Sequence, residues 1–239
     1  MKSLTIGAGE IGQSLHNVLS RGHDSYTRDK EPNKSGYRTN KLDVLNICYP
    51  YSKDFVKITK DYIKQYKPKV TIIHSTVKPG TTKKCGDMVV HSPIHGKHPN
   101  LTDGIRTFTK YIGGDDVHAV YLADKFLTQA GITTRVVANS KTSELSKILC
   151  TSYYGWNLVF MKEVARLCKK EGVPFHEVYT DWNWFYNTGY GKLNMPQFVR
   201  PVLDPVKGKI GGHCVVNNCD LLDSFITETI KDKNKEYES

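Results

Sequence analysis

The sequence has no hydrophobic run that approaches the roughly 20 residues needed to span a bilayer. It enters a strand-like segment at once, without the apolar stretch typical of a signal peptide. Its six cysteines form no CxxC pair and lack the spacing of a zinc site. We therefore expect a cytoplasmic protein with reduced thiols, no membrane association and no metal site.

Acidic residues are scarce relative to basic ones, with 24 Asp and Glu against 34 Lys and Arg and a formal net charge of +10. The basic residues are spread along the chain and form no concentrated arm, so a nucleic-acid-binding protein is the weakest of the alternatives. A basic surface around a cleft for a small anionic molecule fits better. With 239 residues, of which 38% are hydrophobic, the chain can form one large or two small domains.

A glycine motif follows the first apolar segment. Residues 1–6 are typical of a short strand, and apolar residues at 11, 15, 18 and 19 predict a helix. The glycines between them allow a tight turn and the close approach of a pyrophosphate to the helix N-terminus. The order of strand, turn and helix is the context that this pattern requires. We therefore expect a dinucleotide to contact Gly7, Gly9, Glu10, Ile11 and Gly12.

Asp29 follows a second strand-like segment, residues 24–28, about twenty residues beyond the glycines. At this distance a carboxylate accepts hydrogen bonds from the adenosine ribose hydroxyls. A 2′-phosphate would meet a like charge there, so we expect the cofactor to be NAD. Arg28 and Lys30 flank the carboxylate, and for this reason NADP stays as the less favoured alternative.

Short apolar segments alternate with amphipathic ones over residues 1–140. We expect strands at 43–50, 69–74, 88–91, 111–113 and 134–137, and helices at 54–66 and 116–130. Such alternation predicts an α/β domain with a doubly wound, mainly parallel sheet of the Rossmann type. Tyr49 and Pro50 end the strand at 43–50, and we include them among the cofactor-binding residues.

Residues 141–231 have a different pattern, which predicts a small helical domain. A single long helix is expected from Ser143 to Glu171, followed by a loop-rich aromatic stretch and a last helix at 221–230. We expect residues 232–239 to form a disordered charged tail. Residues 187–191, with two glycines, are expected to form a flexible loop.

A thiol lies between glycines and a helix near the C-terminus, in the sequence Gly211-Gly212-His213-Cys214. A cysteine thiolate adds to an aldehyde to give a thiohemiacetal, from which a second hydride can leave to NAD. His213 or a lysine would lower the pKa of such a thiol. A packed and inert cysteine is the alternative.

Several segments in a fixed order carry a resemblance to a known family: GAGEIG, HSTVKPGTT, HSPIHGKHPNL, SELSKILC and GKIGGHC. The chain resembles the nucleotide-sugar dehydrogenases, the UDP-glucose and GDP-mannose dehydrogenase family, from Lys2 to about Leu222. The resemblance implies a Rossmann domain and a helical domain whose long helix builds a homodimer. It also implies that Cys214 attacks the aldehyde made by the first hydride transfer, that Lys147 stabilises developing oxyanions, and that Thr76, near the cofactor, helps to position a water.

The chain departs from the family pattern at several of these positions. Ile94 stands where the family's catalytic glutamate is expected, and His95 and His98 are the nearby groups suited to acid-base work. Thr151 stands for an expected asparagine and Asn218 for an expected aspartate, and we keep both as candidate catalytic residues. The sequence ends where the family's third domain, which helps to hold the sugar nucleotide, would begin.

We therefore expect an NAD-dependent oxidoreductase that oxidises a hydroxyl of a sugar nucleotide or of a smaller hydroxylated anion. Oxidation by two and by four electrons are both consistent with the sequence. The alternative is a dinucleotide-binding sensor or subunit without dehydrogenase turnover, which the missing glutamate and the missing third domain favour.

Overall fold

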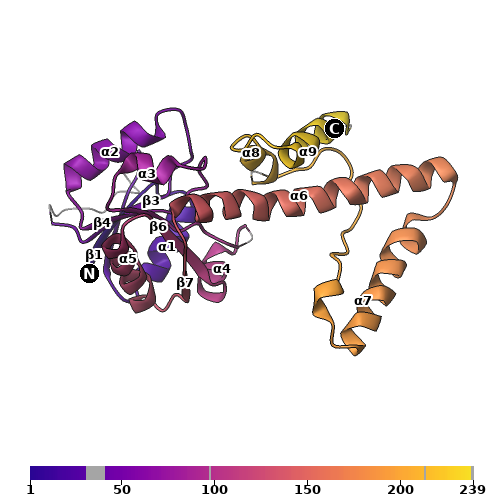
Figure 1. The fold of residues 1–239 in the computed structure, drawn as a ribbon, viewed down its shortest axis with the longest axis horizontal. Coiled ribbons are helices and arrows are strands. Elements are labelled where there is room, and N and C mark those ends of the chain that lie inside the picture. Colours follow the sequence, from indigo (N-terminus) through magenta and orange to yellow (C-terminus); the bar gives the residue numbers. More distant parts are fainter. Residues whose placement is uncertain (31–40, 97, 213, 238–239) are drawn as a thin grey trace. The chain divides into compact units, whose positions relative to one another are not determined.

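The computed structural model describes residues 1–30, 41–96, 98–212 and 214–237 (Figure 1). The chain divides into two compact units, Met1–Lys147 and Ile148–Ser239. The first unit combines a sheet with helices, and the second is helical (Figure 1). None of the helices in the described part of the chain is both long and apolar enough to cross a membrane.

The first unit is built on a sheet that, within the described residues, has the strand order β2-β1-β3-β4-β5-β6-β7. Neighbouring strands are parallel except for β5 and β6, which are antiparallel. The predicted doubly wound, mainly parallel sheet is therefore confirmed. The strands are β1 (Lys2–Ile6), β2 (Asp24–Arg28), β3 (Val44–Ile47), β4 (Val70–Ile73), β5 (Val89–His91), β6 (Lys110–Gly114) and β7 (Thr134–Val137).

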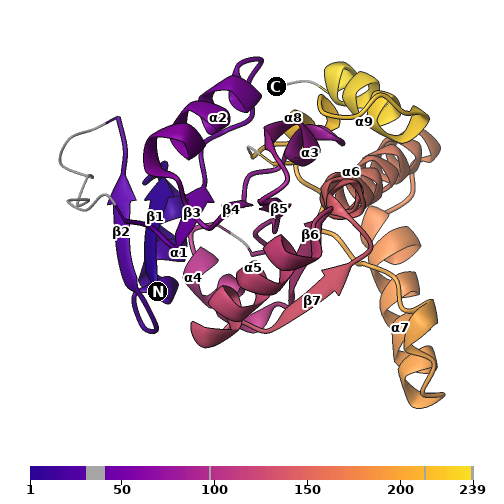
Figure 2. The same cartoon turned by 60° about the vertical axis from the view of Figure 1, so that its left-hand side comes forward.

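Helices cover both faces of this sheet (Figure 2). Helices α1, α4 and α5 enclose one apolar core, and α2 and α3 enclose another on the opposite face. All residues of β3 and β4 are buried, as expected for central parallel strands that are covered on both sides. The helices are α1 (Glu10–Leu19), α2 (Phe55–Tyr66), α3 (Thr81–Cys85), α4 (Leu101–Thr107) and α5 (Val117–Gln129).

The strand order reverses at β1. The chain leaves β1 through α1 to reach β2 on one side, and then returns to place β3 on the other side. In register, Leu4 lies opposite Tyr26 of β2 and Leu45 of β3. In open α/β sheets, ligands bind beyond the carboxyl ends of the strands at such a switch point. The fold therefore directs attention to the residues that follow β1, β2 and β3.

The second unit contains most of a long helix, α6 (Ser140–Glu171), whose first two turns belong to the first unit. This helix was predicted from residue 143 and begins three residues earlier. A π-helical turn at His176–Asp181 leads into the next helix, and the elements that follow are α7 (Trp182–Lys192), a 3₁₀ turn (Pro196–Phe198), α8 (Val215–Cys219) and α9 (Phe225–Glu236). Side chains from α6, α8 and α9 share an apolar core that includes Met161, Val215 and Ile230.

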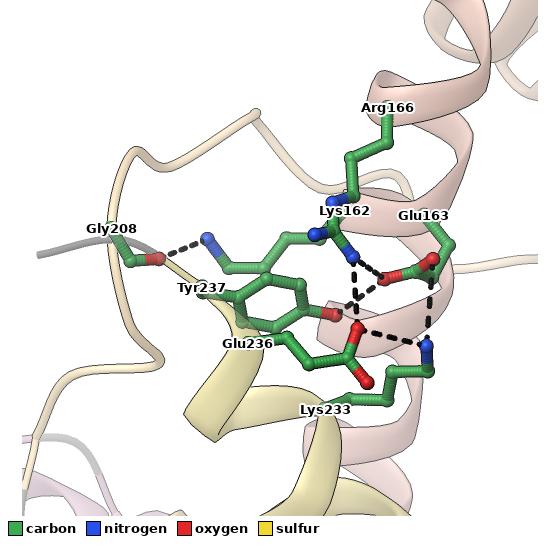
Figure 3. A network of polar contacts seen from close by, with 7 residues as sticks. All are labelled: Lys162, Glu163, Arg166, Gly208, Lys233, Glu236 and Tyr237. Carbon is green, nitrogen blue, oxygen red and sulfur yellow. Dashed lines mark hydrogen bonds and ion pairs between the residues drawn. The ribbon is translucent and has the colours of Figure 1, made fainter.

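Two predictions for this unit are wrong. Residues 187–191 are helical and belong to α7, which has no buried residue and therefore shows no apolar stripe in the sequence. Residues 232–236, predicted as a disordered tail, form the end of α9 (Figure 3). Arg166 binds Glu236 at 3.1 Å, and the Tyr237 hydroxyl donates to Glu163 at 3.2 Å, so α6 holds this end of the helix. Residues 238–239 lie outside the described residues.

Candidate functional site

The glycine motif forms the turn between β1 and α1. Gly7 has a φ of +91°, a conformation that favours glycine, and its N–H donates to the Arg28 carbonyl oxygen at 2.9 Å. A Cβ on Gly12 would lie 1.8 Å from the Gly7 oxygen, so the helix can approach the turn only with glycine at this position. A Cβ on Gly9 would meet no described atom within 4 Å. Gly9 therefore faces open space at the point where a ligand can approach the backbone.

A cleft of about 590 Å³ opens at the carboxyl ends of β1, β2 and β3, where the strand order reverses. Its volume is in the range of small-molecule and cofactor sites. Most of the residues predicted to bind the cofactor line it: Gly7, Gly9, Glu10, Ile11, Asp29, Tyr49 and Pro50. Gly12 supports the turn from behind, and the half-buried Thr76 is not among the lining residues.

Asp29 is tied to the glycine turn. One of its carboxylate oxygens accepts the N–H of Ala8 at 2.5 Å, which holds the acid beside the cleft. Arg28 has its own partners on α2: its guanidinium donates to the Tyr66 hydroxyl and lies 5.6 Å from the centre of the Tyr62 ring. The carboxylate of Asp29 is therefore held at the cleft. Arg28 and Lys30 also line the cleft, and the guanidinium of Arg28 lies against the aromatic rings of α2.

Sequence reasoning did not assign several residues of the cleft to the cofactor. Ile58 and Tyr62 line it from α2, and their place on the apolar face of an amphipathic helix was the available signal. His98 also lines the cleft, and its Nδ1 lies 2.6 Å from a carboxylate oxygen of Glu10. His98 was considered for acid-base work, and the structure places it beside the first turn of α1.

Two lysines hold the segment that follows β5. Lys110 on β6 is 3% exposed, and its Nζ donates to the carbonyl oxygens of Ser92 at 2.5 Å and Pro93 at 3.0 Å. Burial, together with the charge of Lys147, lowers the pKa of Lys110 to about 7 despite an opposing effect of the Cys48 thiol. Lys147 on α6 donates to the Ile94 oxygen at 2.8 Å. The successive carbonyl oxygens of residues 92, 93 and 94 are thus bound by the amino groups of two lysines.

Glu144 fastens the start of α6 to the loop after β4. Its carboxylate accepts the backbone N–H groups of Gly80 at 2.5 Å and Thr82 at 2.7 Å, and also the Thr82 hydroxyl. Burial raises the pKa of this carboxyl, and these hydrogen bonds oppose the rise. The loop that contains Thr76 and the helix turn that carries Lys147 therefore belong to one hydrogen-bonded assembly in the first unit.

Buried histidines lie beneath the same segment. His91 contacts the Ser143 hydroxyl at 2.8 Å and the Ser75 carbonyl oxygen at 3.1 Å, and burial lowers its pKa to about 3. Burial and the charge of Lys147 lower the pKa of His95 to about 4. His95 packs against Phe108 and is not among the residues that line the cleft. Neither ring carries a charge at neutral pH.

These histidines predict acid sensitivity. Below the ordinary pKa of 6.5, the unfolded chain binds protons at His91 and His95 that the folded unit does not bind. The free energy of unfolding should therefore fall as the pH drops from 6.5 towards 4, by up to about 1.4 kcal/mol per pH unit for each histidine. Urea unfolding at several pH values between 6.5 and 4 measures how steeply the free energy of unfolding changes with pH. His91→Gln should reduce the slope and the exposed control His118→Gln should not; equal slopes in all three proteins would contradict the assignment.

Cys214, Thr151 and Asn218 lie in the second unit. Cys214 is exposed and directly precedes α8, and the Asn218 N–H donates to its carbonyl oxygen at 3.1 Å. The Asn218 side chain donates to the Thr151 hydroxyl at 3.1 Å, so the structure brings together two of the three residues that depart from the family pattern. An added Cβ on Gly211 or Gly212 would meet no described atom within 4 Å, so there is open space beside the backbone just before the thiol. His213 lies outside the described residues.

No family model and no curated protein sequence matches the chain. Its fold is similar to that of UDP-D-ManNAc dehydrogenase from Pyrococcus horikoshii, with a TM-score of 0.79, 20% identity and coverage of 99% of this chain and 68% of that one. UDP-glucose dehydrogenase from Pyrobaculum islandicum gives a TM-score of 0.75 at 15% identity, with 98% and 68% coverage. 3-Hydroxyisobutyrate dehydrogenase from Mycobacterium tuberculosis gives 0.70 at 15% identity, with 98% and 92% coverage. The Rossmann-type fold and the resemblance to the nucleotide-sugar dehydrogenases are therefore confirmed at the level of the fold.

Proposed function

We propose that this chain is an NAD-dependent oxidoreductase that oxidises a hydroxyl of a sugar nucleotide or of a smaller hydroxylated anion. The observation that carries the proposal is the cleft at the switch point of the sheet, where the glycine turn and the Asp29 carboxylate face the same space. The turn offers backbone N–H groups to a pyrophosphate, and the carboxylate offers acceptors to ribose hydroxyls. Bound NAD would accept a hydride from the carbon that bears the substrate hydroxyl.

The protein's own residues supply the remaining roles in this proposal. The Lys147 ammonium stabilises the negative charge that develops on the substrate oxygen as its proton leaves. Thr76 positions a water. In a four-electron oxidation, the Cys214 sulfur loses its proton and adds to the resulting aldehyde to form a C–S bond. This tetrahedral adduct would give its hydride to a second NAD and become a thioester, which the water placed by Thr76 hydrolyses to release the carboxylate and the thiol. Thr151 and Asn218, which are hydrogen-bonded to each other, support the segment that carries the thiol.

The comparisons support the range of substrates in this proposal. The chain spans about two thirds of the length of the sugar-nucleotide dehydrogenases it is similar to, but 92% of 3-hydroxyisobutyrate dehydrogenase. The net charge of +10 favours an anion in either case. The direct test is the formation of NADH with a panel of UDP- and GDP-sugars and of small hydroxy acids. Turnover on a member of the panel supports the proposal, and tight NAD binding without turnover on any member contradicts it.

A dinucleotide-binding subunit without turnover is the second candidate, and a specific observation favours it. Ile94 replaces the family's glutamate with a side chain that is only 6% exposed, and His95 packs away from the lining of the cleft. The described segment therefore places no carboxylate where the family has its general base. This candidate predicts that NADH binds and that Lys147→Met changes no measurable activity, because there is none to change.

Asp29 determines the choice of cofactor in this proposal. In Asp29→Asn, the amide oxygen can still accept the Ala8 N–H, but the charge that repels a 2′-phosphate is gone. We expect the preference for NADH over NADPH to fall by about tenfold, equivalent to about 1.4 kcal/mol. Calorimetric titration with both cofactors measures this ratio. Asp24→Asn, an exposed change on the same strand, should leave the ratio unaltered; a ratio that is also unchanged in Asp29→Asn would show that Asp29 does not discriminate.

A further inference from the structure

Side chains from two helices bind backbone atoms of the segment before Cys214, and Figure 3 shows one of these contacts, from Lys162 to the Gly208 carbonyl oxygen. Lys162 on α6 donates from its Nζ to the carbonyl oxygens of Val206 at 2.5 Å and Gly208 at 2.7 Å. Asn234 on α9 accepts the N–H of Ile210 at 2.6 Å. Two helices thus bind alternate residues of one irregular segment, and the thiol lies only a few residues further along the chain.

Lys162 is built into the second unit rather than lying on its surface. It is 7% exposed, and its Nζ lies 5.0 Å from the centre of the Tyr237 ring. Burial lowers the pKa of Lys162. A buried ammonium is costly unless its donors are satisfied, and the two carbonyls and the aromatic face satisfy this one.

The neighbouring charges do not share this role. Glu163, Arg166, Lys233 and Glu236 form exposed ion pairs with one another beside Lys162, at 3.1–3.9 Å (Figure 3). These groups tie α6 to α9, and in the described part of the chain none of them is hydrogen-bonded to residues 206–210. Exposed pairs of this kind contribute little to stability. Arg166 lies on the same helix as Lys162 but does not bind this segment, so a change at Arg166 is a matched control.

The segment itself has little to fix its conformation. Between the 3₁₀ turn at Pro196–Phe198 and α8, the described residues contain no helix or strand. Gly208 and Gly212 have φ values of +73° and +83°, and glycine gives the backbone wide freedom at such positions. Side-chain anchors must therefore supply the order that regular hydrogen bonding does not.

We propose that Lys162 is a positioning residue that fixes the segment carrying Cys214, so that the thiol is presented in one place to the aldehyde. The inference rests on the proposed function, in which Cys214 is the nucleophile. Lys162 does not touch substrate or cofactor in this account and acts only through the Val206 and Gly208 carbonyls. Misplacing a reacting atom by about 1 Å can cost 100-fold in rate, so the anchor should affect the chemical step.

The test compares Lys162→Met, which keeps the apolar stem and removes the ammonium, with Lys162→Arg, whose guanidinium can still donate to both carbonyls. Arg166→Met is the matched control. Hydrogen exchange of residues 206–212 should accelerate at least tenfold in Lys162→Met, stay within twofold in Arg166→Met and recover in Lys162→Arg. In steady-state assays, Lys162→Met should lower kcat at least tenfold and leave the KM for NAD unchanged. Asn234→Ala, which removes the third anchor, serves as a second route should Lys162→Met not fold.

The hydrogen-exchange and kinetic measurements together distinguish failure of this inference from failure of the proposed function. Exchange needs no substrate, so unchanged exchange in Lys162→Met overturns the anchor whether or not the protein turns over. Faster exchange with an unchanged kcat in an active enzyme overturns the positioning role, because the contact would then be only structural. Faster exchange in a protein that binds NADH but turns nothing over upholds the anchor and counts against the proposed function alone.

Discussion

Replacing Gly12 with alanine should abolish measurable binding of NADH, with a loss in affinity of at least about 100-fold, or about 2.7 kcal/mol. The added Cβ would lie 1.8 Å from the Gly7 oxygen, so α1 must move away from the turn that, in our proposal, receives the pyrophosphate. The same strain should also lower the melting temperature. Calorimetric titration with NADH, together with a thermal melt, measures both effects.

Gly9→Ala separates an effect on cofactor binding from an effect on the stability of the fold. A Cβ on Gly9 would meet no described atom within 4 Å, so the fold should keep its melting temperature while a cofactor that approaches the turn closely loses affinity. Gly189→Ala, on α7 in the second unit and equally uncrowded, should change neither affinity nor fold. Wild-type NADH affinity in both Gly9→Ala and Gly12→Ala would show that the dinucleotide does not bind at this turn.

The second large effect is expected in Lys147→Met. Removing a group that stabilises an oxyanion typically lowers kcat by about 10²–10³, and we expect a loss of this size with little change in NADH affinity. Lys147 contacts the Ile94 oxygen and does not line the cofactor cleft, which is why the two measurements should separate. Stopped-flow or steady-state NADH formation gives kcat, and titration gives the affinity.

Lys141→Met is the control for this change, because Lys141 is an exposed lysine on the same helix, two turns before Lys147. It should retain wild-type kcat. Equal activity in Lys147→Met and Lys141→Met would remove Lys147 from the reaction and leave it as an anchor for the segment after β5. A parallel fall in NADH affinity would instead indicate that the change disturbs the sheet.

The part of the fold built on local patterns could be predicted from the sequence. The glycine turn, the mostly apolar buried strands and the long helix from residue 143 each carry a strong local signal. A strand buried on both faces gives a nearly continuous apolar run, and a helix buried along one face gives a helical period. Helix α7 has no such signal, since it buries none of its residues. The end of α9 depends on Arg166 and Glu163, which lie about seventy positions earlier in the chain and are invisible to a local pattern.

The candidate site, too, could be predicted from the sequence only in part. Asp29 and the glycines could be predicted to lie together, because their spacing along the chain is that of a strand–turn–helix unit followed by a second strand. His98 was one of two histidines considered for acid-base work, and the structure pairs it with Glu10 at the cleft. The anchors at Lys110 and Lys162 were missed, since a buried lysine that binds carbonyl oxygens looks in the sequence like any surface lysine. Only the tertiary structure shows their partners.

The central claim is that the cleft beyond β1, β2 and β3 binds NAD. Calorimetric titration of the purified protein with NADH and NADPH tests it most directly, with Asp29→Asn and Gly9→Ala measured beside the wild type. We expect one NADH to bind per chain and NADPH to bind more weakly. The preference for NADH over NADPH should be smaller in Asp29→Asn, and the affinity for NADH should be lower in Gly9→Ala. No heat of binding with either cofactor, or affinities that neither variant changes, would contradict it.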